Sequence, residues 1–185
     1  MMDEVIKHTI DHMEKTITVL TKEFQGVRTG RATAVILDRV SVDYYGVPTP
    51  VAQVAAIKSP EPQLLVIEPW DKSMIGTIEK AILSSDLGLN PSNDGTLIRL
   101  PFPPLTEERR KELVKVCRGY AEDGKVAIRN VRREANDKLK RMEKEGDISQ
   151  DDLRRAEAEV QKETDKFVAR VDDLLKRKEQ EILEV

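Results

Sequence analysis

The sequence predicts an α+β protein, in which a long three-helix bundle carries a small α/β domain inserted between its first and second helices. All nine prolines fall between Pro48 and Pro104, and the segments on either side have the apolar spacing of long packed helices. Between those segments, short β-branched runs alternate with Gly, Pro and Asn, which is typical of strands and turns. We therefore expect a discontinuous bundle from residues 1–30 and 105–185, and an inserted domain from residues 31–104.

The first helix is predicted to include residues 6–27. Its apolar residues recur in alternating steps of four and three, which places them on one face of a helix that packs along its length. That face consists of Ile6, Ile10, Met13, Ile17, Leu20, Phe24 and Val27. A single helix cannot bury such a stripe, so the stripe predicts helical neighbours.

The inserted domain follows the first helix. Four strands and one short helix are expected, with the strands over 41–45, 51–57, 64–68 and 96–100 and the helix over 73–84. Short connections on both sides predict a hinge to the bundle, with proline limiting its freedom. The hinge residues are Thr29, Gly30, Arg31, Pro101, Phe102, Pro103 and Pro104.

The second helix is expected to begin after Thr106, a plausible N-cap, and to end at about Glu145, before Gly146. Glu107 and Glu108 lie in its first turn, where the helix dipole favours anions. At 1.5 Å per residue the helix is about 60 Å long. Its apolar face consists of Cys117, Tyr120, Ile128, Val131, Ala135 and Met142.

The third helix is expected to begin at Ser149, where Asp152 completes a pattern close to a capping box. Its apolar residues are again spaced by three and four. They are Leu153, Ala156, Val160, Thr164, Phe167, Val171 and Leu174. Three long stripes of this kind favour a three-helix bundle with coiled-coil-like packing.

Charge is unevenly distributed along the chain, whose formal net charge is −3 at pH 7. Residues 105–141 contain 12 Lys and Arg against 7 Asp and Glu, a net charge of +5, whereas residues 142–185 contain 9 against 14, a net charge of −5. On the second helix, one face carries Arg118, Lys125, Arg129, Arg132 and Asn136. A basic row on a rigid helix indicates a polyanionic partner.

Two interpretations of this basic row remain open. It could be a solvated helix face whose charges are partly neutralised by Glu122 and Glu134. It could instead bind nucleic acid, since the planar guanidinium group of arginine suits phosphate. Aromatic residues make up only 4% of the chain, so contacts to the phosphates and shape of folded RNA are favoured over base stacking on single strands.

Catalytic and cofactor motifs are missing from the sequence. It contains no phosphate-binding P-loop, dinucleotide fingerprint, nucleophile elbow or zinc-protease motif, so no enzyme activity and no cofactor are expected. His8 and His12 are one helical turn apart, but no carboxylate or cysteine is fixed beside them by local spacing, and a solvated helix face is expected rather than a metal site. Cys117, the only cysteine, is expected to be a buried packing thiol.

The cellular compartment is also predicted from the sequence. The N-terminus lacks the basic start and apolar run of a signal peptide, and no stretch approaches the length of a membrane span. A single cysteine is consistent with a reducing compartment. We therefore expect a cytoplasmic monomer without a membrane partner.

Three stretches resemble the bacterial ribosome recycling factor family. They are VRTGRA at 27–32, LSSDLGLNPSNDGTLIRLPFPPLTEERRKELVK at 83–115 and VAIRNVRREAND at 126–137. The resemblance implies a translation factor that binds the post-termination ribosome. Together with elongation factor G and the GTP bound to that partner, it would split the ribosome into subunits and release mRNA and deacylated tRNA.

The resemblance also implies that the bundle contacts large-subunit ribosomal RNA. The family's RNA-facing arginines match Arg28, Arg110, Arg129, Arg132 and Arg133, and the basic row adds Arg118 and Lys125. The alternative is a helical adaptor or chaperone-like protein that binds a protein partner.

Overall fold

The computed structural model describes residues 1–29 and 31–184, and the predicted hinge residue Gly30 lies outside them. The chain forms two compact units. The bundle unit comprises Met1–Val27 and Lys111–Gln180, and the insert unit comprises Arg28–Arg110 and Glu181–Val185. None of the helices in the described residues is both long and apolar enough to cross a bilayer.

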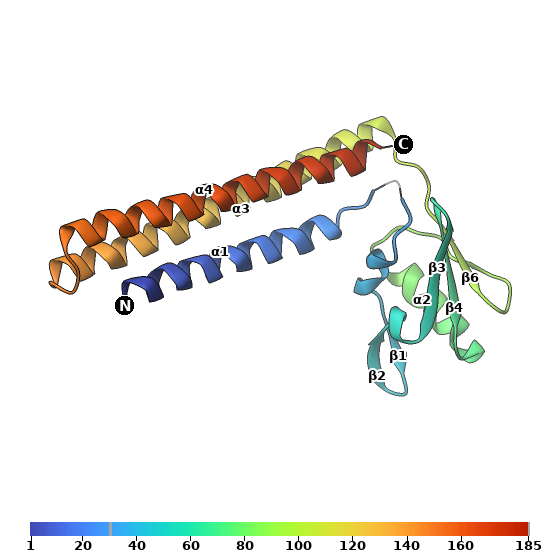
Figure 1. Ribbon diagram of the computed structural model, residues 1–185. Helices are drawn as coiled ribbons and strands as arrows, with labels where there is room; N and C mark the ends of the chain where they lie inside the picture. Colours follow the sequence, from blue (N-terminus) through green and yellow to red (C-terminus); the bar gives the residue numbers. More distant parts are fainter. Residues whose placement is uncertain (30, 185) are drawn as a thin grey trace. The chain divides into compact units, whose positions relative to one another are not determined.

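The bundle unit is built from three long helices, as the sequence predicts (Figure 1). They are α1 (Met2–Gln25), α3 (Glu107–Lys144) and α4 (Gln150–Leu183). The predicted apolar seams are buried at their centres, where Met13, Ile128 and Val171 are fully covered. Val27 is buried although α1 has already ended, and its N–H bonds the carbonyl of Phe24 at 3.1 Å.

The helix ends on either side of the α3–α4 loop follow their predicted signals. Gly146 adopts a φ of 78°, which glycine reaches without strain. Its N–H bonds Glu143 O at 3.0 Å, and the N–H of Asp147 bonds Met142 O at 2.9 Å, which is the hydrogen-bond pattern of a Schellman C-cap. These two bonds satisfy two of the carbonyls that α3 leaves free at its end.

The two N-caps are also formed. Thr106 Oγ1 accepts the N–H of Arg109 at 3.1 Å at the start of α3. At the start of α4, Ser149 Oγ accepts the N–H of Asp152 at 3.0 Å, and Asp152 Oδ2 accepts the N–H of Ser149 at 3.3 Å. The expected capping box is therefore present, with aspartate in place of the usual glutamate.

The insert unit contains two antiparallel sheets. A two-stranded ribbon pairs β1 (Ser41–Tyr44) with β2 (Val47–Pro50), and the larger sheet has the order β3-β4-β6-β5. Its strands are β3 (Ala55–Glu61), β4 (Leu64–Pro69), β5 (Ser92–Asn93) and β6 (Ile98–Pro101). The helix α2 (Ile75–Ser84) follows β4, and short 3₁₀ helices are Ala34–Arg39, Val51–Gln53 and Lys72–Met74.

The core of the insert unit joins α2 to the larger sheet. Ile78 and Ile82, one turn apart on α2, are fully buried in one cluster with Ile67 of β4 and Ile98 of β6. The short helix predicted over 73–84 is therefore present at Ile75–Ser84, and its apolar residues pack into this core.

The prediction of one strand over 51–57 is wrong. Residues Val51–Gln53 form a 3₁₀ turn, and the strand begins only at Ala55. The sequence reading also missed β2, which contains Pro48 and Pro50. Proline lacks the N–H that a sheet interior needs, but a two-stranded ribbon leaves one side of each strand unpaired, so both prolines fit there.

Candidate nucleic-acid interface

The basic row of α3 lies along α4. Arg118, Lys125 and Arg132 are separated by seven residues, about two helical turns, and therefore share a face. Arg118 Nε lies 2.9 Å from Glu179 Oε1, and Lys125 Nζ lies 2.5 Å from Asp172 Oδ1. Both carboxylates belong to α4, so the acidic third helix neutralises part of the basic second helix within the bundle itself.

Lys125 is the most strongly engaged residue of this row. Its side chain is only 17% exposed, and its Nζ also lies 3.9 Å from Glu122, one turn earlier on α3. Arg118 is paired as well, but its side chain remains 63% exposed. Of these two cations, Arg118 is the more accessible to a ligand.

The middle of α3 differs from this paired region. Arg129 and Arg133 are exposed and Arg132 is half-buried. Arg132 Nη1 meets the neutral Oε1 of Gln161 at 3.5 Å. Among the described residues, none of these three guanidinium groups has a carboxylate within salt-bridge distance. Residues 129–133 therefore form a short arginine cluster whose charge the bundle does not neutralise.

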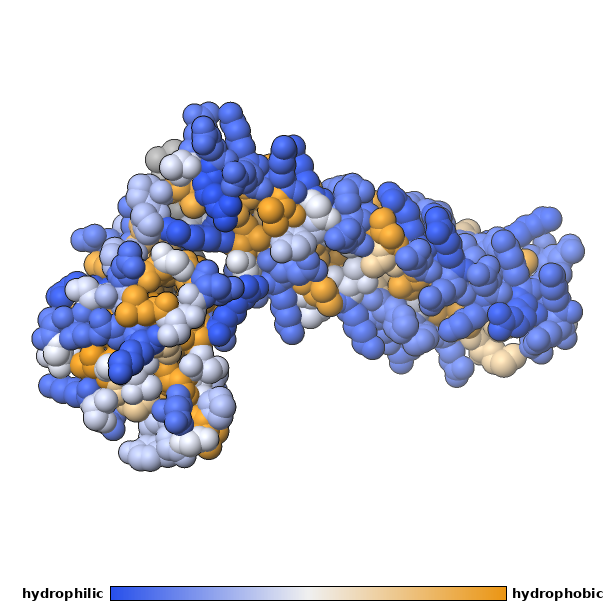
Figure 2. Space-filling view, turned by 180° about the vertical axis from the view of Figure 1, so that it is seen from behind, coloured by the Kyte–Doolittle hydropathy of each residue, from blue (hydrophilic) through white to orange (hydrophobic). Residues whose placement is uncertain are grey.

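The surface around these helices is suited to a polar ligand. Figure 2 shows that the bundle face turned to the viewer is mostly hydrophilic, with its apolar residues in small separate patches. An elongated polar surface of this kind offers a polyanion many solvated charges and little apolar area. The arginine cluster defined above is the part best able to bind phosphate, since arginine donates two parallel hydrogen bonds to such groups.

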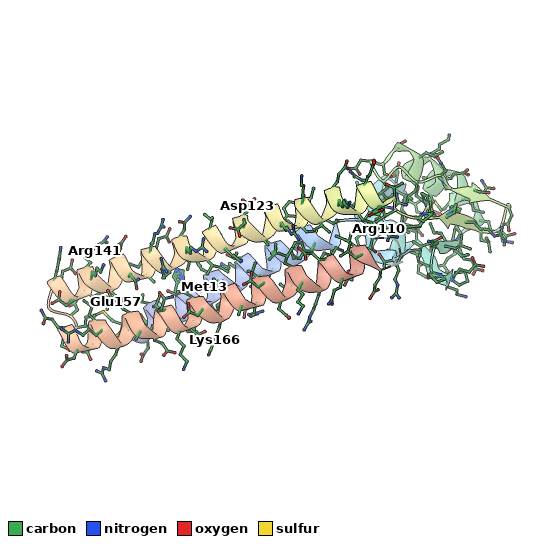
Figure 3. All side chains as sticks on the ribbon, turned by 90° about the horizontal axis from the view of Figure 1, so that it is seen from above. Met13, Arg110, Asp123, Arg141, Glu157 and Lys166 are labelled. Atoms are coloured by element: carbon green, nitrogen blue, oxygen red, sulfur yellow. The ribbon has the colours of Figure 1, made fainter. Side chains whose placement is uncertain are left out.

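Two further predicted arginines belong to the insert unit. Arg28 Nη2 donates to the carbonyl of Pro103 at 2.8 Å, and its guanidinium carbon lies 5.8 Å from the ring centre of Phe102. Burial and the neighbouring charge of Arg109 lower the pKa of Arg28. Within the described residues, the Nε atoms of Arg28 and Arg110 are buried and donate to no acceptor, so each retains an unused donor (Arg110 in Figure 3).

The predicted hinge residues that the structure describes have different environments. Pro101 is the last residue of β6, and Phe102 is 2% exposed with its N–H bonded to Gln63 O at 2.7 Å. Both are thus anchored in the insert unit. Pro103 and Pro104 are exposed beyond the strand, and Thr29 Oγ1 accepts the N–H of Arg31 at 3.4 Å.

The other candidate chemistry is limited. The rings of His8 and His12 contact edge to face with centres 4.2 Å apart, and no group of three or more metal-ligating side chains occurs among residues 1–29 and 31–184. Cys117 is fully buried, as predicted, and burial raises the pKa of its thiol. A raised pKa disfavours the reactive thiolate.

Sequence reasoning missed the partners of the basic row. The signal was present, because Asp165, Asp172 and Glu179 follow each other at seven-residue intervals on the third helix. Such spacing places acidic groups on one face of α4 just as it places cations on one face of α3. The sequence does not say which cation each carboxylate meets.

Comparison with known proteins gives consistent matches over the whole chain. The family model described as "Ribosome recycling factor" matches residues 20–183. Proteins named ribosome-recycling factor from Bacillus cytotoxicus and Bacillus mycoides are 61% and 59% identical over 185 residues, covering 100% of both chains.

Solved structures agree with these sequence matches. A solution structure of the ribosome recycling factor has a TM-score of 0.83 at 38% identity, covering 100% of this chain and 98% of that chain. A second match has a TM-score of 0.69 at 51% identity and covers 100% of both chains. It comes from models of the T. thermophilus ribosome recycling factor and the E. coli elongation factor G bound to the E. coli post-termination complex.

Proposed function

Because this chain belongs to the ribosome recycling factor family, we propose that it binds the post-termination ribosome and, with elongation factor G and GTP, splits it into subunits. Messenger RNA and deacylated tRNA then leave. The chain itself acts as a cytoplasmic, monomeric translation factor without a cofactor of its own. The GTP is bound and hydrolysed by the partner, so the chain's contribution is mechanical rather than enzymatic.

Binding to the ribosome is supported by the arginine cluster at 129–133. Its three guanidinium groups have no carboxylate partner among the described residues and lie near the middle of a helix of 38 residues. Such a helix is about 57 Å long and transmits force with little bending. We propose that this cluster binds phosphates of large-subunit ribosomal RNA.

The other predicted RNA contacts contribute to binding by different amounts. Arg28 and Arg110, which match the family's RNA-facing arginines, add phosphate contacts in this proposal. Arg118 contributes to RNA binding through the exposed part of its side chain. Lys125 contributes least, because its ammonium group is paired with Asp172 and its side chain is mostly buried. Arg118 and Lys125 thus hold α3 against α4 and add less to RNA binding than the arginine cluster does.

We propose that the insert unit is the part of the protein that elongation factor G pushes. Three of the chain's seven aromatic residues lie together there at a depression of about 490 Å³, where Tyr45 is 83% and Trp70 69% exposed. Tyr45 also adopts a φ of 51°, a conformation that asparagine or glycine reaches with less strain. An exposed and strained tyrosine is typical of a contact site rather than of a residue selected for stability.

Domain organisation completes the proposal. The proposed bundle, residues 1–30 and 105–185, binds the ribosome, and the inserted domain at 31–104 moves relative to it through the two connections. These bounds differ from those of the two compact units, which assign Arg28–Arg110 and Glu181–Val185 to the insert unit. Separate cores support this division, because the buried cluster of the insert unit contains residues from Ala32 to Phe102 only. A partner that pushes the insert can then act while the arginine cluster stays bound.

Two experiments test the proposal. Light scattering of post-termination ribosomes should report splitting only when the protein, elongation factor G and GTP are all present. Cosedimentation with large subunits should weaken steeply with salt, because phosphate binding releases counterions. An adaptor that docked an apolar protein groove would instead bind with little salt dependence, and that result would refute the proposal.

A further inference from the structure

Arg132 differs from the other two cations of its row in the residue that α4 places opposite it. Glu179 pairs with Arg118, and Asp172 pairs with Lys125. From the first pair to the second, the cation moves seven residues forward along α3 and the carboxylate moves seven residues back along α4. The same step leads from Asp172 to Asp165 and from Lys125 to Arg132. The repeat therefore predicts a third ion pair between Arg132 and Asp165.

That third ion pair is not formed among the described residues, and Gln161 occupies its place. Gln161 Nε2 donates to Asp165 Oδ1 at 2.8 Å, so the carboxylate is held one turn away along α4. On its other side, Gln161 Oε1 faces Arg132 Nη1 at 3.5 Å. Figure 3 shows α3 and α4 side by side, with Glu157 and Lys166 marking the stretch of α4 that contains both residues.

The amide of Gln161 thus separates a cation from an anion. Its NH₂ group satisfies the carboxylate and its carbonyl oxygen faces the guanidinium, and the side chain carries no net charge. A carboxylate at the same place would pair with Arg132, and an RNA phosphate would then have to compete with that pair. The long contact of 3.5 Å is weak enough for a phosphate to displace.

We propose that Gln161 is a positioning residue for the RNA contact of Arg132: it withholds Asp165 from the guanidinium and orients Arg132 without neutralising it. The inference rests on the proposed function, since it deepens the role of the arginine cluster. In this view the Arg132–Asp165 ion pair is absent because Gln161 prevents it, and the positive charge of Arg132 in the middle of α3 stays available to a ligand.

The first test places a carboxylate opposite Arg132 by the substitution Gln161→Glu. Affinity for isolated large subunits should fall by about two- to fivefold, within the range of a new exposed ion pair. The slope of log affinity against log salt should flatten by about one unit, because one phosphate contact is lost. Thermal stability should stay the same or rise, which a merely structural role for Gln161 would not produce.

The second test removes the Gln161 side chain that separates Arg132 from Asp165. Gln161→Ala frees Asp165 to pair with Arg132, so affinity should again fall, and adding Asp165→Asn should restore it. Gln180→Glu is the matched control, because it adds the same charge on an exposed position of α4 distant from Arg132. It should leave affinity unchanged.

The outcomes separate the two proposals. If Arg132→Gln weakens binding but Gln161→Glu binds like the wild type with the same salt slope, the role of Gln161 is overturned and the proposed function stands. Failure of Asp165→Asn to rescue Gln161→Ala would likewise overturn the withholding of Asp165. If Arg132→Gln itself binds large subunits normally, both the RNA contact and the inference built on it are refuted.

Discussion

Lys125 Nζ on α3 lies 2.5 Å from Asp172 Oδ1 on α4, and this ion pair divides the basic row into two regions. On one side of it, Arg118 is also paired with an α4 carboxylate. Beyond it lies the arginine cluster at 129–133, which has no carboxylate partner among the described residues. The cations that stabilise the helix pair are Arg118 and Lys125, whereas the charge proposed to contribute most to RNA binding lies in the unpaired cluster at 129–133.

Lys125→Gln should lower the free energy of unfolding by about 0.5–1 kcal/mol, because it removes a partly buried ion pair and leaves Asp172 without its cation. Ribosome binding should weaken less than it does for Arg132→Glu. Urea denaturation and cosedimentation measure the two effects. A tenfold loss of binding with unchanged stability would show that Lys125 contacts RNA directly.

Arg132→Glu or Arg129→Glu should weaken binding to large ribosomal subunits more than tenfold. Each change replaces attraction by repulsion at a phosphate-rich surface, and one charge-assisted hydrogen bond is worth about 1.5–3 kcal/mol. Stability should barely change, because neither residue has a charged partner among residues 1–29 and 31–184. Arg154→Glu, an exposed reversal on α4, is the control and should bind normally.

Deleting residues 32–103 and bridging the gap with a short Gly/Ser linker should leave a folded helical bundle, because its buried seams need nothing from the insert. Circular dichroism checks the helix content. This bundle should compete with the full-length protein for ribosomes, yet fail to release subunits when elongation factor G and GTP are added. A disordered bundle would place the insert in the common core, and efficient splitting by the bundle alone would contradict the proposed division of labour.

Tyr45→Asn should stabilise the insert unit by about 0.5–1 kcal/mol, because asparagine tolerates the positive φ of 51° better than tyrosine does. The same change should slow subunit splitting, since it removes an exposed ring from the proposed contact site. Tyr44→Asn is a matched control, because Tyr44 is at the same depression but lacks a positive φ. It should slow splitting without stabilising the fold.

Ser149→Ala should lower the free energy of unfolding by about 1 kcal/mol, because the capping box at the start of α4 loses its side-chain acceptor. Urea denaturation measures this change.

The pKa of Asp152 is lowered, first by its hydrogen bond from the backbone N–H of Ser149 and then by Arg155. A lowered folded pKa means that the stabilisation by Asp152 is complete above its unfolded pKa of about 3.9 and is lost as the pH falls through the lower folded value. The stability difference between wild type and Asp152→Asn should therefore be constant from pH 7 to 5 and shrink below about pH 4. An unchanged difference at pH 3 would contradict this assignment.

Much of the bundle could be predicted from the sequence. Thr106, Gly146 and Ser149 mark helix ends through bonds to residues at most four positions away, and such local bonds are visible in the order of residues. The apolar seams are equally readable, since a stripe at helical spacing must be buried against some neighbour. The family could be recognised for a related reason, because the stretch at 83–115 is long and specific.

The insert was harder to predict. The strand expected over 51–57 was wrong because a 3₁₀ turn at Val51–Gln53 satisfies the apolar pattern equally well. The ribbon strand β2 was missed because proline argues against strands unless a strand has a free edge. Both choices depend on which segment pairs with which, a property of the folded sheet and not of the local sequence.

The sequence by itself determined that one face of the second helix is basic and that the third helix is acidic at the same interval of seven residues. Only the tertiary structure decided which cations are neutralised: Arg118 and Lys125 meet carboxylates, whereas Arg132 meets the amide of Gln161. The physical reason is that ion pairs between helices depend on how two rods are rotated and staggered. Small changes in either, distributed over many packing contacts, decide whether a charge is paired or remains available to a ligand.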